Sequence, residues 1–126
     1  MEKISFLINC SNDTLKHLKL LLNSLLSNLK SDEHEIIIFV DSDNEGTFDW
    51  LITQKPKFKD LKIVTHKVKP CVGYSRNNNL LVELADNDIV SYLQSDMVIS
   101  PGYDTDILRD LEDNCILSST RVEPPL

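Results

Sequence analysis

The chain has 126 residues, the length of one domain, and with 41% hydrophobic and 26% charged residues it has the composition of an ordinary folded protein. Its formal net charge of −7 excludes a general nucleic-acid binder, because binding to a polyanion needs a surplus of lysine and arginine. No stretch comes near the ~20 apolar residues of a membrane span. We therefore expect a cytoplasmic protein, with peripheral attachment to a membrane left open, and reduced thiols at Cys10, Cys71 and Cys115.

Hydrophobic patterning predicts strands and helices that alternate along the whole chain. Short apolar runs predict five strands, at 4–8, 35–40, 61–68, 89–93 and 115–122. Helical periodicity predicts four helices between them, at 14–30, 48–54, 74–85 and 104–111. Such alternation implies right-handed crossovers and a mainly parallel sheet. The predicted fold class is α/β, a Rossmann-like α/β/α sandwich, in a single domain over 1–126.

Polar segments follow three of the predicted strands at the point where each strand ends. They lie at 9–13, 41–46 and 94–96. In open α/β sheets, ligands bind beyond the carboxyl ends of the strands. These segments therefore mark the edge of the sheet where we expect the functional site.

Three charged residues on this edge suit a bound nucleotide diphosphate. Asp96 follows an apolar strand in YLQSDMV and can hold a divalent metal ion, which would neutralise charge on a diphosphate leaving group. Arg76, in GYSRNNN, comes near the start of a predicted helix, where free backbone N–H groups and a guanidinium suit phosphate. Asp41 ends the most apolar strand and can accept a hydrogen bond from a base N–H. Each also has a plain structural interpretation, as a turn or capping carboxylate or a surface arginine.

Other chemistry lacks support in the sequence. The three histidines are far apart and show no metal-ligand spacing, so we expect structural or surface roles for His17, His34 and His66. The GxSxG, Walker A and GxGxxG motifs are absent, which argues against a serine hydrolase, a P-loop NTPase and a dinucleotide-dependent oxidoreductase. A cluster of acidic residues is expected to form a solvated helical face: Asp104, Asp106, Asp110, Glu112 and Asp113.

Taken in order, these segments resemble a family 2 glycosyltransferase of the GT-A fold, from Ile4 to about Val122. The opening strand ISFLINCSN ends in a polar turn, and LLLNSLLSNL resembles the leucine-rich helix that follows it in the family. In FVDSDN, Asp41 falls on the aspartate that contacts uracil. GYSRNNN matches the family's Arg-Asn pair at the start of a helix, and YLQSDM aligns with the DxD motif.

The resemblance implies a site and a reaction. Implied contacts to the nucleotide sugar are Asn9, Cys10, Ser11, Asn12, Asp41, Asp43, Gly73, Arg76, Asn77, Gln94 and Ser95. The cofactor implied is a divalent metal ion, Mn²⁺ or Mg²⁺, held by Asp96. The reaction implied is transfer of a sugar from a nucleotide-diphosphate-sugar donor, with a UDP-sugar favoured, to a hydroxyl of a glycan or another acceptor, with inversion.

Two departures from the family pattern matter. Gln94 stands where the first Asp of DxD is usual, and its neutral amide adds no charge for the metal. No residue after Asp96 has a clear claim as general base, and Glu123 is a weak candidate only for a contact on the acceptor side or the metal side. We therefore expect the base beyond Leu126, in an acceptor-binding part that this donor-binding half lacks, and we expect an exposed apolar surface that favours a homo-oligomer.

Two alternatives remain open from the sequence. A non-catalytic nucleotide-binding or assembly module would explain both the altered DxD motif and the missing base. A nucleotidyltransferase that forms sugar nucleotides shares the sheet topology, but it usually has a Gly-rich loop with a basic residue after the first strand. The segment 9–13 contains neither Gly nor Lys, which disfavours it.

Overall fold

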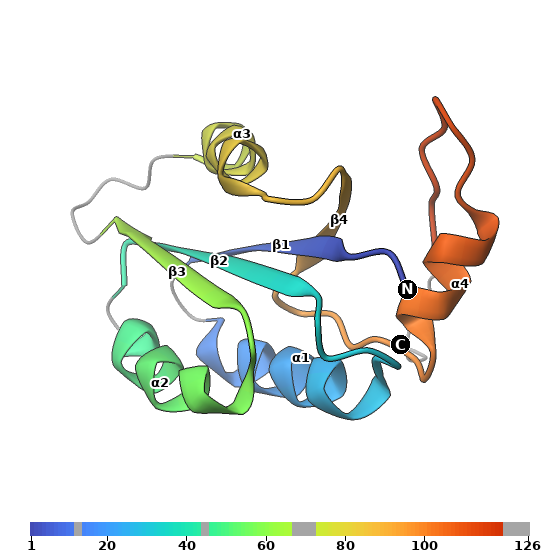
Figure 1. The fold of residues 1–126 in the computed structure, drawn as a ribbon. Helices are drawn as coiled ribbons and strands as arrows, with labels where there is room; N and C mark the ends of the chain where they lie inside the picture. The colour runs from blue at the N-terminus through green and yellow to red at the C-terminus, as the bar shows by residue number, and fades with distance from the viewer. Residues whose placement is uncertain (12–13, 44–45, 67–72, 120–126) are drawn as a thin grey trace, which may run out of the picture.

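The computed structural model describes residues 1–11, 14–43, 46–66 and 73–119, and strands and helices alternate through them (Figure 1). The elements are β1 (Ile4–Cys10), α1 (Leu15–Asn28), β2 (Glu35–Asp41), α2 (Thr47–Gln54), the 3₁₀ turn η1 (Lys55–Lys57), β3 (Leu61–His66), α3 (Tyr74–Leu84), β4 (Ile89–Gln94) and α4 (Tyr103–Asp110). None of the described helices is long and apolar enough to cross a membrane. A cytoplasmic location stays a prediction.

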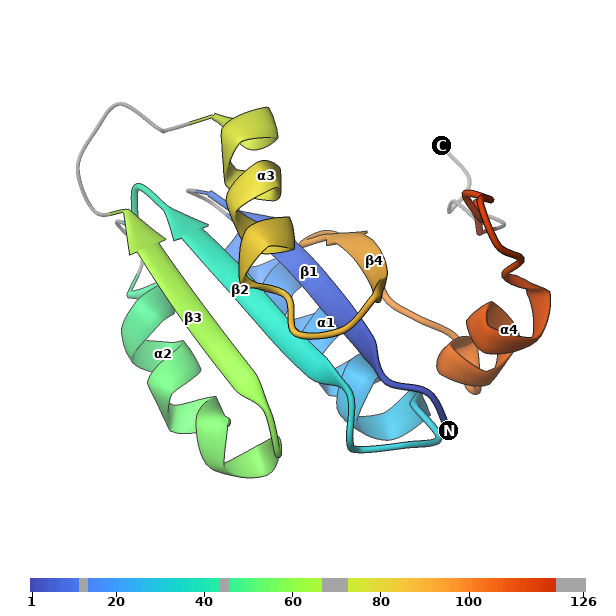
Figure 2. The same cartoon turned by 45° about the horizontal axis from the view of Figure 1, so that its top comes forward.

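The four strands form one sheet in the order β3-β2-β1-β4, and every pair is parallel. Ile8 at the centre of β1 lies level with Ile38 of β2 and Leu93 of β4. Helices α1 and α2 cover one face of the sheet and α3 covers the other (Figures 1 and 2). This confirms the predicted α/β/α sandwich.

Alternating side chains of the strands build a core on each face of the sheet. Phe6, Ile8 and Ile38 point into the larger core beneath α1 and α2, where they meet the leucines of α1. Leu7 and Ile37, one position along, point to the other side and pack against α3. Strand side chains alternate between faces, so a nearly continuous apolar run such as β2 fills both cores.

Helix α4 is attached to the segment between α1 and β2 through a buried carboxylate, although the sequence predicts a solvated one. Asp104 is fully buried. Its oxygens accept hydrogen bonds from the backbone N–H groups of Lys30, at 3.0 Å, and Ser31, at 3.1 Å, and lie 2.9 Å from Nε2 of His34. The expectation of a solvated face is therefore wrong for Asp104, although the other acidic residues of that group are exposed: Asp106, Asp110, Glu112 and Asp113.

The strand expected at 115–122 is absent over the part that the structure describes. Residues 115–119 follow a turn that contains Asn114, with a positive φ of 61°, and they pair with no strand. Ile116 is 99% exposed, so its β-branched side chain has no core to fill. The remainder of that prediction, 120–122, lies outside the described residues, as does Glu123.

Candidate functional site

The carboxyl ends of β1, β2 and β4 converge on one edge of the sheet, beside the first turn of α3. Asn9 and Cys10 end β1, Asp41 ends β2, and Gln94 ends β4. Because β1 lies between β2 and β4, Asn9 is level with both Phe39 and Gln94. The parallel topology thus gathers residues from three distant segments, as the sequence analysis expected.

A polar network joins β1, β2 and α3 at this edge. The Nδ2 atom of Asn77 donates hydrogen bonds to Oδ2 of Asp41, at 2.9 Å, and to Oδ1 of Asn9, at 3.3 Å. The backbone N–H of Gly73 reaches the same Asp41 oxygen at 3.4 Å, and Nδ2 of Asn9 donates to the carbonyl oxygen of Tyr74 at 3.5 Å. Asp41 and Asn77 are both 2% exposed. Four of the expected donor-site residues are therefore in mutual contact.

One acceptor atom of Asn77, Oδ1, takes no part in this network. Because Nδ2 faces two acceptor oxygens, the amide orientation is fixed, with Oδ1 as the remaining acceptor. Among the side chains that the structure describes, Oδ1 of Asn77 is a buried polar atom without a hydrogen-bond partner. Buried polar groups are normally paired. An unpaired one at an expected binding edge is suited to a ligand N–H or O–H group.

A cavity of about 560 Å³ opens beside Asn77, between α3 and the two strands β2 and β3. Phe39 and Val64 form its apolar side, and Arg76 and Leu80 line it from α3. Arg76 is exposed, and within the described part of the chain no carboxylate pairs with it. The volume lies in the range of ligand pockets.

The segment after Asp41 is shaped by an unusual backbone and a helix cap. Ser42 is buried and has a φ of 55°, a region that residues other than glycine seldom enter. The two carboxylate oxygens of Asp43 accept the backbone N–H groups of Thr47, at 3.0 Å, and Phe48, at 2.9 Å. Asp43 therefore caps the start of α2, and its expected contact with a nucleotide stays a prediction.

The end of β4 forms a tight turn that presents Asp96. The backbone N–H of Met97 donates to the carbonyl oxygen of Gln94 at 3.1 Å, and Ser95 is buried in the turn. Gln94 and Asp96 are both exposed. Among the described residues no cation pairs with Asp96, so its carboxylate is available to a hard divalent ion.

The end of β1 and the turn after it make hydrogen bonds within the chain. The thiol of Cys10 is buried and donates a weak hydrogen bond to the carbonyl oxygen of Phe39 at 3.3 Å. Ser11 is exposed, and its carbonyl oxygen accepts from Oγ1 of Thr14 at 2.6 Å. Asn12 lies outside the described residues. Ligand contact by these three residues stays a prediction.

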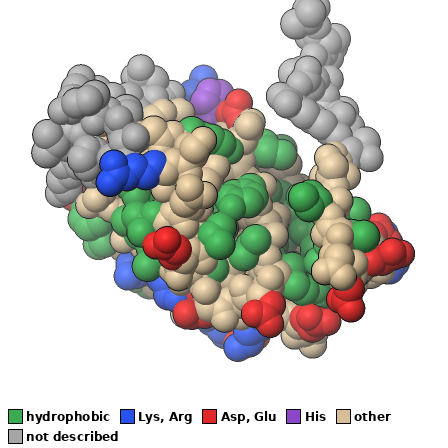
Figure 3. Space-filling view, turned by 90° about the horizontal axis from the view of Figure 1, so that it is seen from above, with side chains coloured by type: hydrophobic (Ala, Val, Ile, Leu, Met, Phe, Trp, Pro, Cys, Tyr) green, Lys and Arg blue, Asp and Glu red, His purple; other side chains and the backbone are tan. Residues whose placement is uncertain are grey.

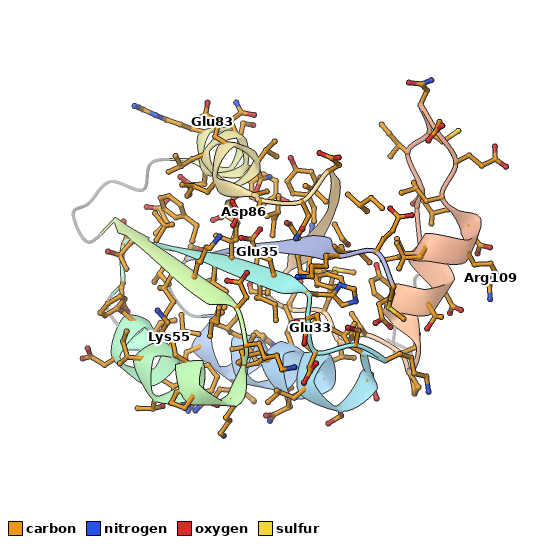
Figure 4. All side chains as sticks on the ribbon, viewed as in Figure 1. Glu33, Glu35, Lys55, Glu83, Asp86 and Arg109 are labelled. Carbon is orange, nitrogen blue, oxygen red and sulfur yellow. The ribbon has the colours of Figure 1, made fainter. Side chains whose placement is uncertain are left out.

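An acidic cluster that the sequence analysis missed lies at the opposite end of the sheet. Single carboxylate oxygens of Glu35, Asp60 and Asp86 come within 4.8 Å of one another, an arrangement that is able to hold a metal ion; Figure 4 labels Glu35 and Asp86. The ammonium of Lys62 already contacts two of them, reaching Oδ2 of Asp86 at 2.6 Å and also bonding Glu35.

The pKa values of this cluster follow from those contacts. Hydrogen bonds to Asp86 and then to Glu35 raise the pKa of Lys62, and the bond from Lys62 lowers the pKa of Asp86. Lys62 therefore stays charged and supplies the positive charge that a metal ion would otherwise bring. No sequence motif signalled this cluster, because its residues come from three separate segments, at 35, 60–62 and 86.

Comparison with known families identifies the class of protein. Residues 5–123 match the model of "Glycosyl transferase family 2", so the chain belongs to this family. No curated protein sequence matches the chain significantly.

Several solved structures share this fold. TarS from S. aureus superposes with a TM-score of 0.74 at 22% identity, over 85% of this chain and 19% of that chain. TarS 1-349 in complex with UDP-GlcNAc gives a TM-score of 0.70 at 24% identity, over 86% of this chain and 29% of that one.

A more distant match is the mannosyltransferase PcManGT from Pyrobaculum calidifontis, solved with GDP-Man and Mn²⁺. Its TM-score is 0.67 at 17% identity, over 82% of this chain and 30% of that one. The likeness establishes the GT-A glycosyltransferase fold. The chain spans less than a third of the length of these proteins.

Proposed function

We propose that this chain binds a nucleotide-diphosphate sugar at the carboxyl edge of its sheet and supplies the donor site for transfer of that sugar to an acceptor hydroxyl. The observation that carries the proposal is the buried network of Asp41, Asn77 and Asn9 beside an open cavity, with a leftover acceptor on Asn77. Family membership supports it, as do the UDP-GlcNAc and GDP-Man complexes of structural relatives.

The base of the nucleotide is assigned to the Asn77 end of the cavity. Uracil carries an N–H between two carbonyl groups, and guanine carries an N–H beside an amino group. Either base offers a donor for Oδ1 of Asn77, and the guanidinium of Arg76 can donate to a carbonyl or phosphate oxygen. Among the donor classes, we favour a UDP-sugar.

The diphosphate is assigned to the space between the start of α3 and the turn at Asp96. Backbone N–H groups in the first turn of a helix attract anions, and Arg76 adds a permanent charge there. Asp96 would hold a Mn²⁺ or Mg²⁺ ion, and Mg²⁺ usually takes one or two carboxylates together with substrate phosphates. When bound, such an ion stabilises the charge of the departing diphosphate. Gln94 and Ser95 would border the ribose and the sugar.

A second candidate follows from Gln94. Its exposed amide replaces a carboxylate at the metal side of the site, which would weaken metal-assisted departure of the diphosphate and leave binding intact. In that case the chain is a nucleotide-binding module without transfer activity. The proposal also includes inversion at the sugar, a hydroxyl acceptor, a general base and a homo-oligomeric state.

Thermal unfolding with candidate ligands tests the proposal. UDP, GDP, CDP and the sugar conjugates UDP-GlcNAc and GDP-Man are added with and without Mn²⁺. A ligand at a hundredfold excess over its dissociation constant should stabilise the fold by about 2.7 kcal/mol. The expected result is stabilisation by one base class, increased by Mn²⁺.

Asp96→Asn should remove the stabilisation that depends on Mn²⁺ and leave the stabilisation that the nucleotide gives without metal. Asp88→Asn is the matched control, because Asp88 is an exposed aspartate at the other end of β4. Stabilisation by no nucleotide would overturn the proposal. Nucleotide binding without Mn²⁺ dependence, in wild type and in Asp96→Asn alike, would favour the non-catalytic module.

A further inference from the structure

The layer formed by α1, α2 and η1 is positively charged, although the chain is acidic. It contains four lysines, Lys16, Lys19, Lys55 and Lys57, and a single carboxylate, Asp49. Its net charge of +3, set against −7 for the whole chain, leaves −10 on the remaining residues. We call this layer the basic helical face.

All four lysines are exposed. Across residues 1–11, 14–43, 46–66 and 73–119, no carboxylate forms an ion pair with any of them. The ammonium of Lys19 lies 5.5 Å from the ring centre of Trp50, so the outer surfaces of α1 and α2 are continuous. Lys59, by contrast, is already paired with Asp32 at 3.1 Å and with Glu33 at 2.5 Å.

Aliphatic side chains are exposed among these lysines. Leu20 is 54% exposed, Leu26 41% and Ile52 46%, although the inner sides of both helices supply the buried leucines of the core. Lysine ammonium groups reach lipid phosphates while their alkyl stems lie along apolar surface. A helical surface with basic and aliphatic side chains is suited to the interface of an anionic membrane.

The opposite face of the molecule has a different character. Seen from the α3 side, hydrophobic and neutral side chains occupy the centre, and carboxylates with some lysine and arginine side chains among them lie along one edge (Figure 3). The uneven charge gives the molecule one orientation on a negative surface. Figure 4 labels Lys55 beside α2, in the layer that lies below the sheet in this view.

We propose that the basic helical face docks the protein reversibly on a membrane that contains anionic lipids. Because α1 and α2 each begin just after the carboxyl ends of β1 and β2, the donor site would lie at one end of the docked layer, beside the lipid surface and still open. The docking rests on charge and exposed apolar area alone, so it does not depend on nucleotide binding.

Vesicle co-sedimentation tests the proposal. Vesicles of phosphatidylcholine mixed with phosphatidylglycerol should bind the protein, and vesicles of phosphatidylcholine alone should not. Raising the salt concentration should weaken binding, because the Debye length shortens to ~3 Å at 1 M. Each lysine near an anionic surface contributes about a fivefold change in partitioning, so Lys16→Gln/Lys57→Gln should lower it about 25-fold.

The matched control is Lys3→Gln/Lys59→Gln, which removes the same net charge from exposed lysines outside the face. It should retain binding to within about twofold. Equal loss in both double variants would overturn the proposal, since net charge alone would then explain binding. Failure of wild type to bind mixed vesicles would overturn it as well, and so would binding to soluble polyphosphate but not to vesicles. Thermal unfolding of each variant checks that the fold is retained.

Discussion

The Nε2 atom of His34 lies 2.9 Å from Oδ2 of Asp104, and both side chains are buried. The other ring nitrogen, Nδ1, accepts the backbone N–H of Ile4 at 3.0 Å. An acceptor at Nδ1 places the ring proton on Nε2, which then donates to Asp104. A neutral histidine therefore connects the start of β1 to the start of α4.

Replacing Asp104 should destabilise the whole fold. Asp104→Ala would leave the N–H groups of Lys30 and Ser31 and the Nε2–H of His34 buried without an acceptor. We expect the free energy of unfolding to fall by about 3 kcal/mol, as measured by urea denaturation. Asp106→Ala is the control, because Asp106 is exposed, and it should change stability by about 0.5 kcal/mol or less. Equal effects would contradict the assignment.

The lowered pKa of Asp104 predicts that the stability of the fold depends on pH in the acid range. Burial acts to raise the pKa of Asp104, but the N–H of Lys30, His34 and the N–H groups of Ser31 and Thr105 outweigh it, so the pKa lies below its ordinary value. A group with a lowered pKa in the folded state stabilises the fold above its unfolded pKa of about 3.9. That stability is lost as the pH falls from about 4 through the folded pKa.

Urea titrations between neutral and acid pH measure this effect. Wild type should lose stability steadily below pH ~4. The Asp104→Asn variant should have a smaller free energy of unfolding at neutral pH. That free energy should also fall less steeply than in wild type as the pH is lowered. A decline of the same slope in both proteins would assign the acid sensitivity to other carboxylates.

Lys62 should be required for stability at the other end of the sheet. Glu35 is 1% exposed and has Lys62 as its cationic partner, with the hydroxyl of Ser5 and the N–H of Asp86 as its neutral donors. Lys62→Met would leave Glu35 beside Asp86 without that cation. We expect a loss of about 2 kcal/mol, measured by urea denaturation.

The control for this variant is Lys59→Met, which removes two exposed ion pairs and should leave stability nearly unchanged. Calcium should restore part of the stability of Lys62→Met and leave wild type unchanged, because the ion would replace the ammonium among the three carboxylates. If Lys62→Met is as stable as wild type and calcium does not change its free energy of unfolding, then Lys62 does not neutralise the cluster.

Asn77 should be required for nucleotide binding. Asn77→Ala removes the amide that joins Asp41 to Asn9 and the free acceptor at the cavity. We expect nucleotide affinity to fall about tenfold, the effect of one buried hydrogen bond, measured by calorimetry. Asn78→Ala, on the half-buried next residue of α3, should bind as wild type does. Unchanged affinity in Asn77→Ala would remove Asn77 from the site.

Gln94→Asp should strengthen metal binding. The substitution puts a second carboxylate on the exposed turn that carries Asp96, and affinity for divalent ions rises with ligand charge. We expect the Mn²⁺ concentration at half-maximal stabilisation, with nucleotide present, to fall about tenfold. The double variant Gln94→Asp/Asp96→Asn should lose this gain. An unchanged Mn²⁺ midpoint would show that the turn does not hold the ion.

The sheet and its flanking helices could be predicted because they depend on local patterns. The run EIIIFV predicts a buried strand wherever it lies, and the leucine steps of α1 predict one apolar side. The failed strand at 115–122 shows the limit of this reasoning. Its β-branched residues favour extended backbone, but a strand also needs a partner, and residues 115–119 have none.

The carboxyl ends of β1 and β2 also bring Asn9 and Asp41 to one edge, beside Asn77 of α3, because parallel topology places all carboxyl ends on the same side. Which atoms meet there depends on distances between distant segments, so only the fold decides that Asn77 Oδ1 is unpaired and that Asp43 caps a helix. Asp104 illustrates the difference most clearly. In the sequence it is one of several carboxylates in a polar helix, and it becomes a buried acceptor only because the backbone N–H groups near residue 30 and the ring of His34 lie against it.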